Sequence, residues 1–248
     1  MRVAVLAVLA AVLALAASSA QARRGPSLPP LNVIDRLVLR GQPVFCGGTG
    51  RRVFALTFDD GPSPWTETLV AALRRGHAPA TFFLVGNRIR FWTAGAQAAA
   101  AEGAIGDHTW SHPVLTKLNR KRIHDELEWP LYELRTKLYT TTRLFRPPYD
   151  RVNPKVERIA ASLGLLDVRW NVDSDDSRVG ARPRAVVREV IRNLKPGAIV
   201  LLHDTHPWTA SVVRRVLAAA RRMHLRPLTI PQLLNDDPPT PEENCYAP

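Results

Sequence analysis

Short apolar runs alternate with amphipathic helical stretches along most of this 248-residue chain. The runs that predict buried strands are Val53–Phe58, Ala80–Val85, Leu144–Phe145, Leu166–Trp170 and Ala198–Leu202. The stretches that predict helices are Thr66–Arg75, Arg90–Glu102, Arg120–Lys137, Pro154–Leu163, Ala185–Leu194 and Ala210–His224. Pro130 lies inside one of these helices and predicts a kink or a break there. Strand–helix units repeated about six or seven times predict a parallel sheet, either closed into a barrel or doubly wound.

Polar side chains follow several predicted strands at the point where each strand ends. They are Asp59, Asp60, Arg146, Asp173, His203 and Asp204. Because the carboxyl ends of parallel strands meet at one edge of the sheet, ligands and catalytic groups gather there in both architectures. We therefore expect an active site at this edge.

The first 22 residues are not expected to belong to this fold. Arg2, the apolar run Val3–Ala17 and the small residues ending at Ala22 predict a secretory signal that is cleaved after Ala22. A retained membrane anchor is the alternative, although the apolar run is short for a bilayer. Residues 23–50 are rich in Pro, Gly and Arg and are predicted to be irregular, 51–235 to form the domain, and 236–248 to form a surface tail.

Export would permit disulfide bonds, and the chain has two cysteines, Cys46 and Cys245. A bond between them would tie together the two ends of the domain, but sequence position alone does not establish the geometry of a disulfide.

The formal net charge is +12, and most of the basic residues are arginines. No nucleic-acid-binding motif is present, and the arginines are spread over many predicted helices, so we expect no nucleic acid partner. Attraction to an anionic cell envelope or polysaccharide agrees better with export. A solvated basic surface without a partner is the alternative.

Two motifs offer the ligands of a catalytic metal. Asp59 and Asp60 are adjacent carboxylates, and His108 and His112 stand four residues apart, a spacing that places them on one side of a single helical turn. One carboxylate and two neutral imidazoles would leave a divalent metal with an open position for water, and the second carboxylate could act as a base. Each motif alone also fits a simple turn or an isolated polar pair, but their combination favours a metal.

Two further motifs could complete such a site. The loop Phe145–Tyr149 contains two prolines that restrict its backbone, so that the Tyr149 N–H could be held as an oxyanion donor. His203 follows a strand with acids nearby, and a neighbouring carboxylate favours the imidazolium form that a general acid needs. An ordinary proline turn carrying a surface arginine is the alternative for the loop.

The sequences TFDDGP, HTWSHP, RPPY and LLH, in this order and spacing, resemble the motifs of the polysaccharide deacetylase family, whose core is the chitooligosaccharide deacetylase homology domain. The similarity extends over about Val53 to Leu234, and ATFFLVG from Ala80 also resembles the second strand of that family. The resemblance implies a distorted (β/α) barrel with about seven parallel strands. It also implies the hydrolysis of N- or O-acetyl groups on an acetylated polysaccharide or oligosaccharide.

The resemblance further implies roles for individual residues. A divalent metal, usually zinc, with cobalt, nickel and manganese as alternatives, would be held by Asp60, His108 and His112. Asp59, oriented by Arg146, would be the base for the metal-bound water, and the Tyr149 N–H would stabilise the oxyanion. His203 would be the acid, paired with Asp176, and Asp173 lies earlier in the same motif. The residues implied in the substrate pocket are Leu201, Pro147 and Pro148.

Two positions depart from the family pattern. Ser177 stands where Trp is common, which opens one wall of the site, and Asp150 stands where Gly is common. The Asp150 carboxylate could repel anionic substrates or pair with a nearby arginine. We expect a secreted or envelope-associated deacetylase of chitin-type glycans, peptidoglycan or acetylxylan. The alternative is a cell-wall polysaccharide-binding protein that has lost catalysis. The absence of a G-x-S-x-G motif argues against a serine hydrolase.

Overall fold

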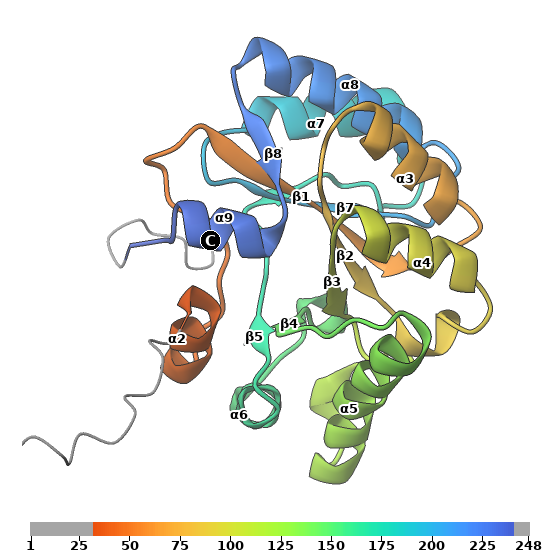
Figure 1. Ribbon diagram of the computed structural model, residues 1–248, viewed down its shortest axis with the longest axis vertical. Helices are drawn as coiled ribbons and strands as arrows, with labels where there is room; N and C mark the ends of the chain where they lie inside the picture. The colour runs from red at the N-terminus through yellow and green to blue at the C-terminus, as the bar shows by residue number, and fades with distance from the viewer. Residues whose placement is uncertain (1–31, 241–248) are drawn as a thin grey trace, which may run out of the picture. The chain divides into compact units, whose positions relative to one another are not determined.

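A curled sheet of parallel strands forms the centre of the computed structural model, which describes residues 32–240. Its strands are β1 (Val53–Gly61), β2 (Thr81–Leu84), β3 (Ala104–Asp107), β4 (Leu144–Phe145), β5 (Leu166–Asp167), β6 (Val172–Asp173), β7 (Ile199–His203) and β8 (Arg226–Leu228). Seven strands follow the order β5-β4-β3-β2-β1-β7-β6, and β8 pairs separately with β1 (Figure 1). Within the described residues no pairing joins the edge strands β5 and β6, so the sheet curls without closing. The predicted distorted (β/α) barrel is confirmed.

Helices connect the strands and cover the outer face of the sheet. They are α2 (Val33–Arg40), α3 (Thr66–Arg75), α4 (Thr93–Glu102), α5 (Arg120–Lys137), α6 (Pro154–Ser162), α7 (Pro183–Asn193), α8 (Thr209–Arg222) and α9 (Ile230–Asp236). Three 3₁₀ turns, η1 (Gly86–Arg88), η2 (Leu115–Lys117) and η3 (Pro148–Asp150), follow β2, β3 and β4. Helix α8 packs against both α3 and α7, and α3 packs against α4 (Figure 1).

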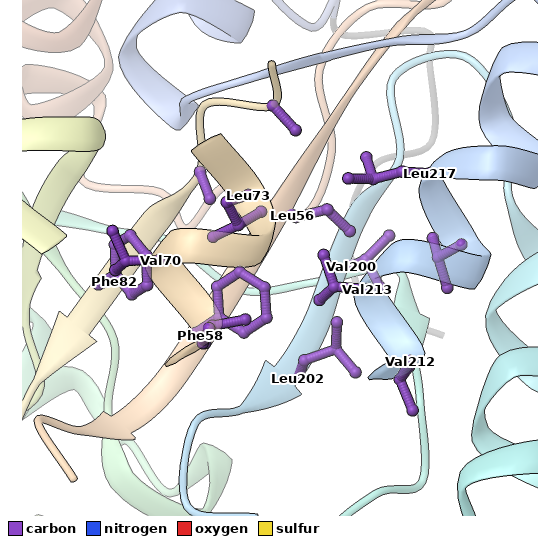
Figure 2. Close-up of a cluster of buried hydrophobic side chains, with 14 of the residues drawn as sticks. Leu56, Phe58, Val70, Leu73, Phe82, Val200, Leu202, Val212, Val213 and Leu217 are labelled. Carbon is purple, nitrogen blue, oxygen red and sulfur yellow. The ribbon is translucent and has the colours of Figure 1, made fainter. Parts of the chain in front are cut away.

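Strand β1 divides its side chains between two environments, because successive residues of a strand point to opposite faces. Leu56 and Phe58 enter the main hydrophobic core under α3 and α8, where Phe58 stacks on Phe82 at 5.4 Å between ring centroids (Figure 2). Burying side chains of this size stabilises the fold by about 1.5–3 kcal/mol each. Thr57 and Asp59 point instead into the barrel, where both contact Arg146. The strand that anchors the core therefore also delivers a carboxylate to the site.

Most predicted elements are present, but several short ones were missed. The prediction that residues 23–50 are irregular is wrong for Val33–Arg40, which forms helix α2, and the following Val44 is buried in a core with it. The sequence also gave no indication of β3, β6, β8 and α9. The predicted strand Leu166–Trp170 is reduced to the two residues of β5. These short elements have weak periodicity, and packing against neighbours rather than local preference maintains them.

Pro130 does not break its helix, so of the two predicted effects, a kink or a break, the break is wrong. Helix α5 runs from Arg120 to Lys137 without interruption. A proline has no N–H to donate to the carbonyl four residues earlier, which here belongs to Glu126. The Trp110 N–H donates to that Glu126 oxygen instead, at 2.8 Å. The hydrogen bond lost within the helix is thus replaced by one from a loop.

Three predictions fall wholly or partly on residues outside the described range. The signal at 1–22, most of the tail at 236–248 and Cys245 lie there. Cys46 is disulfide-bonded, while its predicted partner Cys245 is outside the described residues. Among residues 32–240, no helix has the length and apolar character needed to cross a membrane.

Candidate active site

A cavity of about 250 Å³ opens at the carboxyl edge of the sheet. Nine of the predicted site residues line it: Asp59, Asp60, His108, His112, Pro147, Tyr149, Asp173, Leu201 and His203. Arg146 and Asp176 do not line the cavity but lie buried behind it, each bonded to a lining residue. The prediction is wrong for Pro148, which is buried in η3 and does not line the cavity. The polar residues at the strand ends therefore converge as expected.

The two adjacent carboxylates reach the same cavity because β1 is irregular at its end. Neighbouring strand residues ordinarily face opposite ways. Asp60, however, has a left-handed backbone with φ of 69°, and the pairing of β1 with β2 shifts its register between Phe58 and Gly61. The Arg88 guanidinium donates to the Asp60 carbonyl and supports this turn from η1. A left-handed conformation in a residue other than glycine is uncommon and marks a constrained position.

Asp60, His108 and His112 form a set of three metal-ligand candidates. Their ligand atoms all lie within 4.8 Å of one another, with Asp60 Oδ1 at 3.5 Å from His108 Nε2 and 3.0 Å from His112 Nε2. The His108 Nδ1 lies 2.7 Å from the Arg146 carbonyl oxygen. That contact needs a proton on Nδ1, which leaves Nε2 free as a ligand.

These residues fit a divalent metal. Asp60 Oδ1 is buried and accepts no well-formed hydrogen bond, so it has a lone pair aimed at a centre shared with the two imidazoles. Burial alone would raise the pKa of Asp60, but the neighbouring His108 and His112 side chains outweigh burial and hold that pKa well below its usual range. A carboxylate that stays ionised beside two imidazole nitrogens is a donor set suited to zinc and to related divalent ions.

A buried glutamate, which sequence reasoning missed, holds the loop between the two histidines. We call His108–His112 the ligand loop. The Glu126 side chain, 1% exposed, accepts hydrogen bonds from the Ser111 N–H and the Ser111 hydroxyl, both at 2.8 Å. Its main-chain oxygen accepts from the Trp110 N–H. Pro130 makes that oxygen available, as described above. Three hydrogen bonds that the ligand loop donates to Glu126 of α5 thus fix this loop, whose backbone has positive φ values at Thr109 and His112.

Arg146 is completely buried and orients Asp59. Its Nη1 donates to Asp59 Oδ1 at 2.8 Å and to Thr57 Oγ1 at 2.7 Å. Its Nε and Nη2 donate to the carbonyl oxygens of Val168 and Arg169, and the guanidinium lies 4.1 Å from the ring centroid of Phe83. Because Oδ1 of Asp59 is held by this cation, Oδ2 remains available, at 3.9 Å from His108 Nε2. The geometry suits a base beside a metal.

His203 is paired with Asp176 through both carboxylate oxygens. Asp176 Oδ1 lies 2.6 Å from His203 Nδ1, and Oδ2 accepts the His203 main-chain N–H at 2.7 Å. Burial would lower the pKa of His203, but the hydrogen bond and charge of Asp176, aided by Asp59 and Asp60, raise it to about 9. His203 is therefore an imidazolium at neutral pH, as a general acid requires.

The two other predicted carboxylates near His203 have different partners. Asp204 accepts a hydrogen bond from the Thr66 hydroxyl, and Asp173 accepts one from the Asp175 N–H.

Asp150 pairs with Arg169, in agreement with the expectation that its carboxylate could pair with a nearby arginine. The Arg169 Nη1 donates to Asp150 Oδ1, and the same guanidinium binds both oxygens of Asp167. Tyr149 and Asp150 both have left-handed backbones, with φ of 59° and 56°, and the Tyr149 ring packs against His112 at 4.6 Å between centroids. One oxygen of the Asp150 carboxylate is thus paired with Arg169.

Comparison with known proteins decides the family. A family model described as polysaccharide deacetylase matches residues 47–168. The chitooligosaccharide deacetylase of Bradyrhizobium sp. (strain ANU 289) is 35% identical over 164 residues, which are 64% of this chain and 74% of the relative. The chain belongs to the polysaccharide deacetylase family.

Other members of the polysaccharide deacetylase family agree in sequence and in structure. The peptidoglycan-N-acetylglucosamine deacetylase PgdA of Listeria monocytogenes is 32% identical over 193 residues, 76% of this chain and 40% of that protein. The family 4 carbohydrate esterase from Streptomyces lividans, solved in complex with acetate, has a TM-score of 0.69 and 31% identity, over 75% of this chain and 95% of that one. The chain spans less than half the length of the Listeria relative.

Proposed function

We propose that this protein is a metal-dependent deacetylase that hydrolyses N- or O-acetyl groups of a polysaccharide. The observation that carries the proposal is the grouping of three candidate metal-ligand atoms in one cavity with two oriented pairs, Asp59 with Arg146 and His203 with Asp176. A protein that only binds glycans has no need for a base and a charged acid that line the same cavity. The family relationship supports the same activity.

Asp60, His108 and His112 would hold the metal, and zinc suits these donors best. When bound, it would supply Lewis-acid polarisation of the acetyl carbonyl and make water more acidic. Asp59 accepts the proton of the attacking water at Oδ2, since Arg146 occupies Oδ1. The Tyr149 N–H would donate to the developing oxyanion.

The leaving group is protonated by His203. Its Nδ1 is held by Asp176, so the proton that it gives to the sugar nitrogen or oxygen comes from Nε2. Asp176 both orients the ring and keeps it charged. Leu201 and Pro147 line the cavity as the apolar part of its wall, where the acetyl methyl would lie.

The substrates that we propose are chitin-type oligosaccharides, peptidoglycan and acetylxylan. Names of relatives support the first two, since the matched proteins include a chitooligosaccharide deacetylase and a peptidoglycan deacetylase. We also propose that the protein is secreted or associated with the cell envelope, because its first 22 residues have the composition of a secretory signal.

The proposal is tested by acetate release. Protein treated with a chelator and then resupplied with zinc, cobalt, nickel or manganese is assayed on the three substrate classes. We expect release that disappears on chelation and returns with a metal, and a fall of at least 100-fold in Asp59→Asn, which keeps the side-chain shape but removes the base. No release from any class with metal present would refute the proposal. Equal release by wild type and Asp59→Asn, with equal glycan binding, would instead favour a binding protein.

A further inference from the structure

A second cleft, of about 480 Å³, adjoins the catalytic cavity. It runs along α7 and the loop before that helix. The two hollows share the segment 173–178. Asp173 and Ser177 line the catalytic cavity, whereas Ser174, Asp175 and Arg178 line the second cleft. The two hollows therefore lie along one short segment of the chain.

The second cleft is basic. Its four arginines are Arg178, Arg182, Arg188 and Arg192, against two acids, Asp175 and Glu189. Arg178 pairs with Asp175 at 2.9 Å, and Arg192 pairs with Glu189 at 3.1 Å. Arg182 and Arg188 are exposed and have no ion pair to any described acid. Two guanidinium groups are thus available, each with several donors in a planar fork that matches carboxylate or phosphate oxygens.

Among the residues that the structure describes, those lining the catalytic cavity have mixed charge and include no arginine. Its lining includes four carboxylates, from Asp59, Asp60, Asp150 and Asp173. Two of these face arginines, Asp59 with Arg146 and Asp150 with Arg169. An acidic substituent would therefore meet unpaired arginines only in the second cleft, one or more sugars away from the acetyl group being cleaved.

Ser177 lies at the junction between the two hollows. It is exposed and small, and it lines the catalytic cavity one residue before Arg178 of the cleft. A bulky side chain at this position would stand between them. The sequence difference at Ser177 therefore leaves a small side chain at this junction.

We propose that the second cleft binds acidic substituents of the glycan strand whose acetyl group lies in the catalytic cavity, with Arg182 and Arg188 as the binding groups and Ser177 as the passage. The inference rests on the proposed function, because it extends the substrate of the same site. The acidic groups are carboxylates or phosphates on sugars next to the one that is deacetylated. The protein would thus prefer an anionic acetylated glycan to a neutral one.

Three tetrasaccharides of equal length test this preference. One is chitotetraose, which is neutral. The second alternates N-acetylglucosamine with N-acetylmuramic acid and adds lactyl carboxylates. The third is chitotetraose with a 6-phosphate, which separates phosphate from carboxylate recognition. The double variant Arg182→Gln/Arg188→Gln is compared with Arg214→Gln/Arg215→Gln, a matched pair of exposed arginines on α8.

At low ionic strength we expect wild type to have a higher kcat/KM on at least one anionic substrate than on chitotetraose. The anionic-to-neutral ratio should fall about five- to tenfold in the Arg182/Arg188 variant and stay at the wild-type value in the control. Ser177→Trp should lower the ratio as well. Binding of the same tetrasaccharides to metal-free protein, measured by calorimetry, should follow the same order.

The outcomes separate this inference from the proposed function. Acetate release with the same ratio in wild type and the Arg182/Arg188 variant would overturn the cleft while leaving the deacetylase intact. Preferential binding of anionic tetrasaccharides without any acetate release would support the cleft and refute the deacetylase. An unchanged ratio in Ser177→Trp would overturn the passage over Ser177.

Discussion

Replacement of Asp176 by asparagine should remove the positive charge of His203, the proposed general acid. Against the opposing effect of burial, Asp176, aided by Asp59 and Asp60, raises the pKa of His203 from 6.5 to about 9. A shift of this size corresponds to about 3 kcal/mol of preference for the imidazolium. Asp176→Asn keeps the side-chain shape but removes the charge, so the pKa of His203 should fall to its ordinary value or below. At about pH 8 the protonated fraction then drops from roughly 90% to roughly 3%, and kcat should fall about 30-fold.

The same shift predicts how stability depends on pH. A pKa that is raised by folding stabilises the native state fully below the unfolded value of 6.5, and this stabilisation is lost as the pH rises through about 9. Urea unfolding of metal-free wild type should therefore show about 3 kcal/mol less stability from this histidine above about pH 9.5 than at about pH 6. In Asp176→Asn the contribution of His203 to this difference should disappear.

The assay is an NMR titration of His203 in metal-free protein, followed by a pH–rate profile with the metal restored. Asp173→Asn is the matched control for the titration, because Asp173 is in the same loop but its carboxylate accepts from the Asp175 N–H. An unchanged titration midpoint for His203 in Asp176→Asn would refute the assignment of Asp176 as the source of the raised pKa.

Three further substitutions test the framework of the site. Glu126→Gln removes one of the acceptors that hold the ligand loop, so it should weaken zinc binding about 10- to 100-fold in a chelator competition. Glu128→Gln, at an exposed position of the same helix, should leave zinc affinity unchanged. Equal zinc affinities of the two variants would contradict the role of Glu126. Arg146→Met leaves the buried Asp59 carboxylate unpaired, so it should lower the free energy of unfolding, measured in urea, by about 3–5 kcal/mol. A loss below about 1 kcal/mol would contradict the stabilising role of this ion pair. Gly106→Ala places a methyl group against the Phe83 ring, so it should lower the free energy of unfolding by about 1–3 kcal/mol in the same assay. An unchanged urea midpoint of unfolding would show that the ring can move aside.

Much of the architecture was predictable from the sequence, because apolar periodicity identifies long helices and the end of an apolar run identifies the end of a strand. Helices α3 and α5 begin and end at the predicted residues. Asp59 lies, as predicted, near the carboxyl end of β1 and lines the cavity at that edge of the sheet. Strand β3 was not predictable, since the close packing of Phe83 requires a glycine at 106, and a glycine weakens the apolar pattern of a strand.

Groups that act through tertiary contacts could not be found in the sequence. Glu126 belongs to a helix of ordinary composition, and its role arises only because the ligand loop folds onto that helix. The expected break at Pro130 was wrong for the same reason, because the replacement donor comes from Trp110, far from the proline in the chain. Arg146 was predictable through resemblance, but its bonds to Thr57 and to two carbonyl groups were not.

The position of Arg146 affects how freely this protein can diverge. The sheet does not close, and the segment that links its edges, β5 to β6, contains Val168 and Arg169. Arg146 donates hydrogen bonds to the main-chain oxygens of Val168 and Arg169. Because these acceptors belong to the backbone, substitution of the Val168 or Arg169 side chain leaves both of them in place. Trp170 and Ser177, which line the cavity, follow along the same stretch of chain. Sugar preference could therefore evolve, or be engineered, along this open edge while the orientation of Asp59 is preserved.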